Sequence, residues 1–303
     1  MSAAVRSAAV RITDVLATHG EGPVWDARSG RLLLVDMLDG TVVDVGAADE
    51  LPAFDPSAGE PPSSARHRVG TVAAALRPRA RGGFVLALEN GFALADDTLG
   101  TIEALPPVFT DPSIRMNDGG CDPQGRFYCG TMAYDATPGA GTLYRLNTDL
   151  SVDVVLEGVT ISNGLQWSAD GRRVFYNDTA TGRVDVFDVD GDTGAFSNRH
   201  PFATIEPDAG APDGMAIDDE GGIWIALWEG GAVRRYDSAG RLTDVVSVPA
   251  SRVTACAFGG PDLRSLFITT SRVDLAPGEQ PQAGSVFRHD VAVPGAAPHP
   301  FAG

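Results

Sequence analysis

The sequence predicts an all-β protein, a six-bladed β-propeller with four-stranded antiparallel blades around a central channel. A phrase made of an apolar anchor, a short Asp/Gly turn and a β-rich run recurs six times along the 303 residues. Its spacing of about 42 to 52 residues is the length of one propeller blade. No segment shows the apolar period of an amphipathic helix of ordinary length. The 36 Gly and 21 Pro also favour tight turns over long helices.

The repeat accounts for the chain one blade after another. Each copy begins at an anchor, turns at a pair such as Asp-Gly that supplies the positive φ of a tight hairpin, and continues as a strand. The copies at 82–87 and 261–268 are the weaker ones. The turns are expected at residues 30, 82, 125, 171, 221 and about 263. The strand runs are expected at 25–36 and 39–45, 82–87, 122–130 and 141–146, 167–176 and 182–189, 217–226 and 231–236, and 261–268.

We expect residues 1–303 to form a single domain. Residues 46–67, rich in Ala, Pro, Ser and acidic residues, predict a loop inserted in the first blade, and residues 273–282 predict another loop before the last strand. Such loops are either inert connections or lids over the central pocket. Residues 10–16 alternate as a strand ahead of the first blade, and we expect the last blade to take them as its outer strand.

Charge and cysteine usage exclude several classes of function. The net charge is −17, and all 23 basic residues are Arg without any basic block, so neither nucleic acid nor an anionic membrane is an expected partner. Three Cys are too few and too badly spaced for a disulfide framework or a thiolate zinc site. The apolar runs are too short to span a membrane. An odd number of cysteines without a secretory signal fits a reducing cytoplasm, so we expect a cytoplasmic protein. We also expect a monomer or a weak homo-oligomer.

One repeat position carries polar side chains in several blades. It lies four residues before the anchor, at the entry of the innermost strand, and equivalent positions converge at the mouth of the channel. Two carboxylates that face each other there need a cation between them. Carboxylate and amide oxygens suit hard divalent ions such as Ca²⁺, Mg²⁺ or Mn²⁺, so we expect a metal in the channel. The residues at this position are Glu21, Asn117, Asn163 and Asp213, with Thr254 in the last blade.

Five phrases, in order along residues 15–290, closely resemble the SMP-30/gluconolactonase/luciferin-regenerating family. The phrases occupy residues 20–25, 115–119, 125–132, 161–167 and 212–218. The resemblance implies one divalent ion held by Glu21, Asn163 and Asp213. It also implies that Arg115 and Asn117 contact the substrate, with Asn117 near the metal or bound to it directly or through water. Ca²⁺ is the expected ion, and Zn²⁺, Mn²⁺, Mg²⁺ and Fe²⁺ are the alternatives.

The resemblance further implies hydrolysis of a sugar lactone. The chain departs from the animal members where they carry a Glu pair that helps to hold the sugar, because it reads Tyr134-Asp135 there. Asp135 is predicted to bind substrate with a side chain one methylene shorter. The hypothesis is a metal-dependent lactonase that opens a small aldonolactone to its acid, with Asp213 as general base. His19, the histidine near a ligand, is expected to have a supporting or solvent-facing role.

Two other classes of function remain open at this point. The same residues could serve a phosphotriesterase-like hydrolase. The propeller could also be a non-catalytic scaffold whose metal is structural. Arg115 beside the ring argues against the scaffold, because a structural ion does not need a positively charged side chain next to it.

Overall fold

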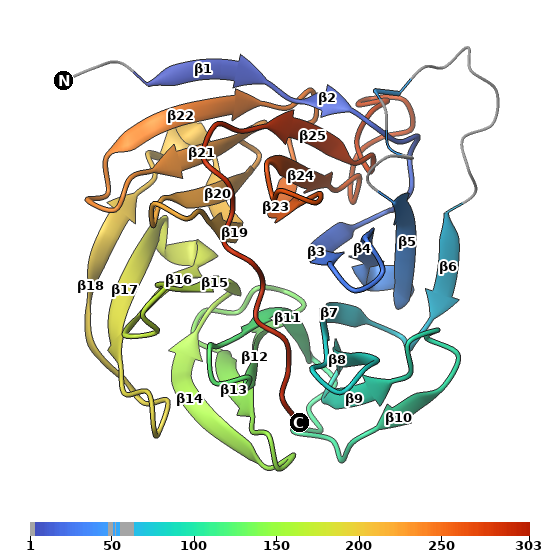
Figure 1. Cartoon of the computed structure of the whole chain (residues 1–303), viewed down its shortest axis with the longest axis vertical. Helices are drawn as coiled ribbons and strands as arrows, with labels where there is room; N and C mark the ends of the chain where they lie inside the picture. Colours follow the sequence, from blue (N-terminus) through green and yellow to red (C-terminus); the bar gives the residue numbers. More distant parts are fainter. Residues whose placement is uncertain (1–3, 48–50, 52, 55–63) are drawn as a thin grey trace.

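The structure is a computed structural model that describes residues 4–47, 51, 53–54 and 64–303. Within these ranges the chain forms six β-sheets arranged as blades around a central axis, which confirms the predicted six-bladed propeller (Figure 1). The helices of the described ranges are three short 3-10 turns, none with the length and hydrophobicity needed to cross a bilayer. They are η1 (Met37–Asp39), η3 (Thr179–Thr181) and η4 (Pro207–Ala209).

Each blade runs from the axis outward in chain order. The innermost strands of blades 1 to 6 are β3 (Gly20–Asp26), β7 (Ala73–Pro78), β11 (Ile114–Cys121), β15 (Ser162–Trp167), β19 (Ala211–Ile217) and β23 (Val253–Gly259). The second strands are β4 (Arg31–Asp36), β8 (Phe84–Leu88), β12 (Phe127–Ala133), β16 (Arg173–Asp178), β20 (Ile223–Trp228) and β24 (Ser265–Thr270).

The outer strands complete the blades. The third strands are β5 (Thr41–Ala47), β9 (Phe92–Ala95), β13 (Gly141–Leu146), β17 (Arg183–Val189), β21 (Ala232–Tyr236) and β25 (Phe287–Asp290). The fourth strands of blades 1 to 5 are β6 (Ala65–Arg68), β10 (Ile102–Ala104), β14 (Val152–Val159), β18 (Phe196–Thr204) and β22 (Leu242–Ser247).

The N-terminal segment closes the ring, as predicted, but with a shorter strand than expected. β2 (Val10–Arg11) pairs antiparallel with β25 as the outer strand of blade 6. Beyond β2 the segment stays joined to the last blade by single backbone hydrogen bonds, from Ile12 N to Val286 O and from Leu16 N to Gly284 O, while the Asp14 carboxylate accepts the Val15 N–H and the Arg11 guanidinium at a turn. The sequence did not indicate β1 (Val5–Ala8), which pairs parallel with β22 and makes blade 5 five-stranded.

The six predicted turns between first and second strands all contain a left-handed residue. All six contain a Gly, which adopts positive φ without a Cβ clash, and the sixth combines Gly260 (φ +82°) with a left-handed Leu. Each turn reverses the chain at the far end of the blade from the predicted ring. The residues are Gly30 (φ +67°), Gly82 (+93°), Gly125 (+78°), Gly171 (+68°), Gly221 (+76°) and Leu263 (+54°).

The predicted inserted loop, residues 46–67, falls largely outside the described residues. Residues 46–47 and 65–67 instead belong to β5 and β6. The register places Ala47 opposite Arg31, at the end of blade 1 away from the start of β3. The loop at 273–282 lies between β24 and β25, on the face where the inner strands begin.

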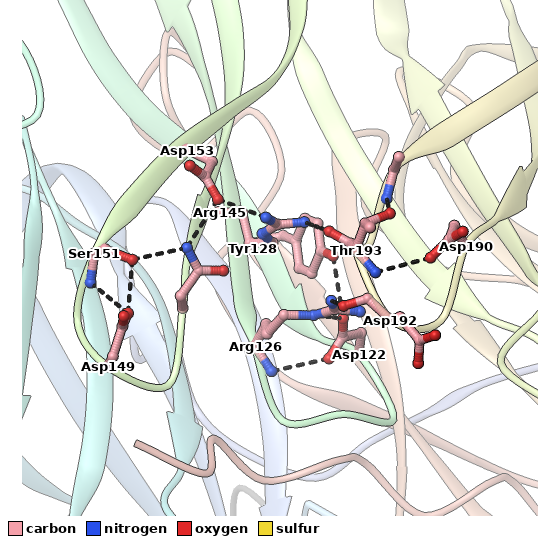
Figure 2. Close-up of polar contacts among 12 residues, drawn as sticks. Asp122, Arg126, Tyr128, Arg145, Asp149, Ser151, Asp153, Asp190, Asp192 and Thr193 are labelled. Atoms are coloured by element: carbon pink, nitrogen blue, oxygen red, sulfur yellow. Dashed lines mark hydrogen bonds and ion pairs between the residues drawn. The ribbon is translucent and has the colours of Figure 1, made fainter.

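Neighbouring blades are joined by polar clamps as well as by apolar side chains. Figure 2 shows one clamp, in which two arginines of blade 3 reach the β17–β18 turn of blade 4. Arg126 donates through Nη1 to the Asp192 carbonyl at 3.3 Å, and Arg145 donates through Nη1 to the Thr193 carbonyl at 2.6 Å. The fully buried Asp122 fixes Arg126 through a 2.5 Å ion pair. These contacts join blade 3 to the turn between the two outer strands of blade 4.

The C-terminal segment crosses the far end of the channel (Figure 1). It is held by backbone hydrogen bonds, including Gly295 N to Leu263 O at 2.8 Å and Phe301 N to Pro78 O at 2.9 Å. Phe301 is completely buried. A cavity of about 360 Å³ lies between this segment and the inner strands. The predicted ring therefore sits at the other end of the channel, where the inner strands begin.

Candidate functional site

All six inner strands carry a β-bulge close to their first residues. A bulge inserts an extra residue into one strand and redirects the side chains around it. The repeat position predicted to form the ring falls at or beside the bulge in every blade. The register shifts occur between Glu21 and Val24, Ala73 and Ala75, Met116 and Gly119, Asn163 and Leu165, Pro212 and Met215, and Val253 and Ala255.

The structure brings the predicted ring residues of blades 1, 3, 4 and 5 to one point at the axis. Glu21, Asn117, Asn163 and Asp213 are each at most 6% exposed. Asp213 is among the charges that raise the pKa of Glu21, so the carboxylates of blades 1 and 5 are electrostatic neighbours. The ring position of blade 6 is Thr254, whose hydroxyl donates to the Gly20 carbonyl at 2.6 Å and so supports the strand that carries Glu21.

The two amides of the ring are held by neighbouring strands. Asn117 Nδ2 donates to the Ser162 carbonyl at 2.8 Å, across the boundary between blades 3 and 4. Asn163 Nδ2 donates to Thr179 Oγ1 at 3.2 Å, and that hydroxyl donates to the Pro212 carbonyl at 2.8 Å. This chain of contacts fixes Asn163 against the residue next to Asp213. The two oxygen-bearing side chains of blades 4 and 5 are thereby preorganised.

The two ring carboxylates are in an unfavourable environment for charge. Burial and the neighbouring carboxylates raise the pKa of Glu21 well above its ordinary value. Burial, followed by the charge of Asp118, raises the pKa of Asp213 in the same way. Asp213 Oδ1 is buried and has no hydrogen-bond partner among the described residues. An unpaired buried carboxylate oxygen is costly, so this atom is placed to accept a cation or a donor group.

A divalent cation fits this arrangement. Two carboxylates supply two negative charges, Asn163 supplies an amide, and the set contains only oxygen ligands of the kind that Ca²⁺ prefers. A bound cation would satisfy Asp213 Oδ1 and remove the repulsion between Glu21 and Asp213. The described ranges hold no group of three or more His, Cys, Asp or Glu side chains placed to bind a metal, so the amide oxygens of the ring would have to complete the ligand set.

Asp118 is a third carboxylate at the site, and the sequence analysis assigned it no role. It lines the channel cavity directly below the ring, and burial raises its pKa while Arg77 opposes that rise. In a regular strand Asn117 and Asp118 would face opposite sides. The bulge places both near the axis, so simple alternation could not have revealed Asp118.

Arg115 borders the ring on the side of blade 3. Its Nη1 donates to Asn117 Oδ1 at 2.6 Å, and its side chain lies 5.8 Å from the centre of the Tyr134 ring. Tyr134 in turn donates to Glu89 Oε1 at 2.7 Å. Asp135 instead stabilises an exposed turn, because its Oδ1 accepts both the N–H and the hydroxyl of Thr137. Tyr134, which was not assigned a role, is the residue of this pair beside Arg115.

His19 is buried rather than solvent-facing. Its Nδ1 is 2.8 Å from Ser271 Oγ, and its ring makes an edge contact with Trp228 at 6.0 Å. Burial, together with the positive charges of Arg115 and Arg252, lowers the pKa of His19 to about 3. The imidazole is therefore neutral at physiological pH. The three cysteines are free and buried, and burial raises the pKa of each thiol, which leaves them unreactive.

Several known proteins are similar to this chain over most of its length. Residues 19–272 match the profile of the SMP-30/Gluconolactonase/LRE-like region. Regucalcin of Danio rerio is 38% identical over 94% of this chain and 95% of its own length. YvrE of Bacillus subtilis is 36% identical over 97% of this chain and 99% of its own length. It is provisionally named a sugar lactone lactonase. A calcium-binding protein, regucalcin, from Agrobacterium tumefaciens superposes with a TM-score of 0.89 at 27% identity, covering 99% of both chains.

Proposed function

Since this chain belongs to the SMP-30/Gluconolactonase/LRE-like family, we propose that it hydrolyses a small sugar lactone to the aldonic acid with one divalent ion. Its relatives support lactone hydrolysis as the general activity. The observation that carries the metal dependence is the buried Glu21–Asp213 pair with the unpartnered Asp213 Oδ1. The substrate is a small neutral molecule that enters where the inner strands begin.

Glu21, Asn163 and Asp213 would hold the ion, with Asn117 in contact directly or through water. Ca²⁺ is the ion we propose first, since the set is all oxygen and a structural relative is a calcium-binding protein. Zn²⁺, Mn²⁺, Mg²⁺ and Fe²⁺ are the alternatives. When bound, the ion supplies a Lewis acid for the lactone carbonyl.

The side chains of this protein would perform the remaining steps. Arg115 is buried beside the ring and can donate to an oxygen of the lactone, which orients the ester. Asp213 can accept a proton from the water that attacks the carbonyl carbon. The ring C–O bond then breaks, and the ring oxygen takes the proton that Asp213 had accepted, which gives the hydroxyl of the aldonic acid. His19 is neutral and hydrogen-bonded to Ser271, so its role is to support the wall of the site.

The edge of the site would set the choice of sugar. Tyr134 stands beside Arg115 and is held by Glu89, so the substrate meets an aromatic ring at this edge. Asp135 would bind substrate through Oδ2, because its Oδ1 already accepts two hydrogen bonds from Thr137.

A pH-indicator assay of several aldonolactones against Ca²⁺, Mg²⁺, Mn²⁺, Zn²⁺ and Fe²⁺ tests the proposal. We expect at least one lactone to turn over with metal and the chelated protein to lose that activity. Full activity after metal removal would contradict the proposal. Faster hydrolysis of a fluorophosphate than of every lactone would favour the phosphotriesterase-like alternative. Failure of every lactone, ester and phosphotriester with metal present would favour a scaffold.

We expect stabilisation by metal to grow as the pH rises. Without metal, the raised pKa values of Glu21 and Asp213 make the folded state bind protons more tightly than unfolded carboxyls, which titrate near pH 4. Their contribution to stability is present below that pH and is lost as the pH rises through the folded values. A bound divalent ion replaces those protons. The Tm gained on replacing EDTA with saturating Ca²⁺ should therefore be larger at pH 8 than at pH 5.

Two variants control this measurement. Glu21→Gln should lose most of the increment that depends on pH, because it removes one of the two coupled carboxylates. Glu103→Gln, at an exposed position on β10, should behave as the unmodified protein. An equal Ca²⁺ increment at both pH values would contradict the proposed coupling between protons and metal.

A further inference from the structure

A second set of equivalent positions lies two residues before the ring. Blade 3 carries Arg115 there, blade 6 carries Arg252, and blade 1 carries His19. Blades 3 and 6 are on opposite sides of a six-bladed ring (Figure 1). The positive charges of both arginines act on His19. The repeat therefore places two guanidinium groups on opposite sides of the same site, and the proposed function uses only Arg115. The other blades have Val72, Ile161 and Ala211 at this position.

Arg252 has unused hydrogen-bonding capacity. Its side chain is 15% exposed, and its Nε donates to Glu229 Oε1 at 2.6 Å. Its Nη1 is buried with no hydrogen-bond partner among the described residues. Its guanidinium lies 5.2 Å from the centre of the Trp228 ring, which also contacts His19. A donor kept without an acceptor beside a candidate site indicates a group that binds ligand.

The surrounding structure holds Arg252 in place. The Arg252 carbonyl accepts the Ser271 N–H at 2.9 Å, and Ser271 also contacts His19. Gln280 accepts the Ser251 N–H at 2.8 Å and donates to its hydroxyl at 2.9 Å, so the loop at 273–282 braces this wall. Glu229 lies in the turn between β20 and β21 with a left-handed φ of +59°, and its carboxylate reaches Arg252 from there.

On the basis of the proposed function, we propose that Arg252, Glu229 and Trp228 form a second subsite that binds the hydroxyl groups of an uncharged polyhydroxy lactone. The guanidinium provides a donor and the carboxylate an acceptor, which together match a hydroxyl group. Trp228 provides an apolar surface of the kind that lines small-molecule sites. Arg115 would hold the ester end of the same substrate from the opposite side.

The charges favour an uncharged substrate over a phosphorylated or acidic one. Glu229 already neutralises Arg252 at 2.6 Å. Glu89 and Asp135 add two more carboxylates at the opposite edge, and the whole chain carries a net charge of −17. An anionic group would be repelled on approach.

Arg252→Met is the test variant, and Arg234→Met is its matched control. Arg234 forms a similar ion pair with Glu206 at 2.7 Å and is 17% exposed, but it lies on β21, the third strand of blade 5. The substrates are D-glucono-1,5-lactone and δ-valerolactone, which has the same ring without hydroxyls. We expect Arg252→Met to lower the ratio of kcat/KM for gluconolactone over valerolactone by about 10-fold or more, mainly through KM. Arg234→Met should keep the original ratio.

Three results would overturn the subsite. One is an equal loss on both lactones, and another is an unchanged ratio. The third is a phosphorylated gluconolactone that outperforms gluconolactone and loses most in Arg252→Met, because Arg252 would then bind an anion. If Arg252→Met fails to fold, Glu229→Gln replaces it, with a smaller loss of the same ratio expected.

Calorimetric binding of D-glucitol, an uncharged polyol without an ester, separates the subsite from the proposed reaction. If no lactone turns over but Arg252→Met weakens glucitol binding and Arg234→Met does not, the subsite stands and lactone hydrolysis is wrong. If lactones turn over and glucitol binds equally to all three proteins, hydrolysis stands and the subsite is wrong.

Discussion

Replacing Asp213 by Asn is expected to lower kcat by about 10²–10⁴-fold at saturating metal, the cost of losing a general base. The amide keeps an oxygen donor at the position of the buried, unpartnered Oδ1 but cannot accept the proton from water. It also reduces the charge of the Glu21–Asp213 pair from −2 to −1, so affinity for the ion must fall. The assay therefore needs a metal titration for each protein before kcat is compared. Near-normal kcat with metal bound would place the base elsewhere.

Asn117→Ala provides a contrast within the same ring. Asn117 Oδ1 accepts Arg115 Nη1 at 2.6 Å, and its Nδ2 is tied to Ser162. If its task is to contact substrate and steady Arg115, its loss should mainly raise KM, because ground state and transition state lose the same contact. A large fall in kcat with unchanged KM would instead assign Asn117 to the chemical step.

Deleting residues 1–16 is expected to cause a large loss of thermal stability. The deletion removes β1 and β2 and exposes the edges of β22 and β25, which belong to adjacent blades. It also removes Ile12, which is buried, and the backbone bonds from Ile12 to Val286 and from Leu16 to Gly284. Burial of one Ile and loss of several hydrogen bonds together amount to about 5 kcal/mol or more. The Tm should fall by about 10 °C or more in a chain of this size.

Deletion of residues 1–4, which end before β1, is the control and should leave the Tm almost unchanged. Calorimetry of the three proteins in the same buffer, with Ca²⁺ held constant, measures the difference. An unchanged Tm in the longer deletion would refute closure of the ring by this segment. A loss of the same size in both deletions would show that the two strands are not its cause.

The six-bladed architecture could be predicted because the features that define it, tight turns at a regular spacing, depend on residues close together in the sequence. Turns such as those at Gly125 and Gly171 need positive φ, and the residues that supply it stand in the sequence at the spacing of a blade. The ring could be predicted for a related reason. Once the repeat is recognised, equivalent positions in different blades must meet at the axis, so Glu21 and Asp213 become neighbours although nearly 200 residues separate them.

Other features depend on how neighbouring blades pack, and no local sequence pattern predicts them. The bulge in β11 brings Asp118 to the axis beside Asn117, against the alternation expected of a strand. Tyr134 meets Glu89 across blades 3 and 2. β1 adds to blade 5 in parallel, a pairing that its own residues do not specify.

By itself, the sequence determined the six-bladed fold, the ring of oxygen-bearing residues and the closing strand at Val10, because each follows from backbone dihedrals and a repeat that act over short distances. Only the tertiary structure decided which charges share the site. Arg252 opposes Arg115, and Trp228 lies beside both Arg252 and His19, because β-bulges and loop paths orient side chains that no local rule relates. The raised pKa values of Glu21 and Asp213 likewise arise from burial and from carboxylates on other strands, and so required the folded chain.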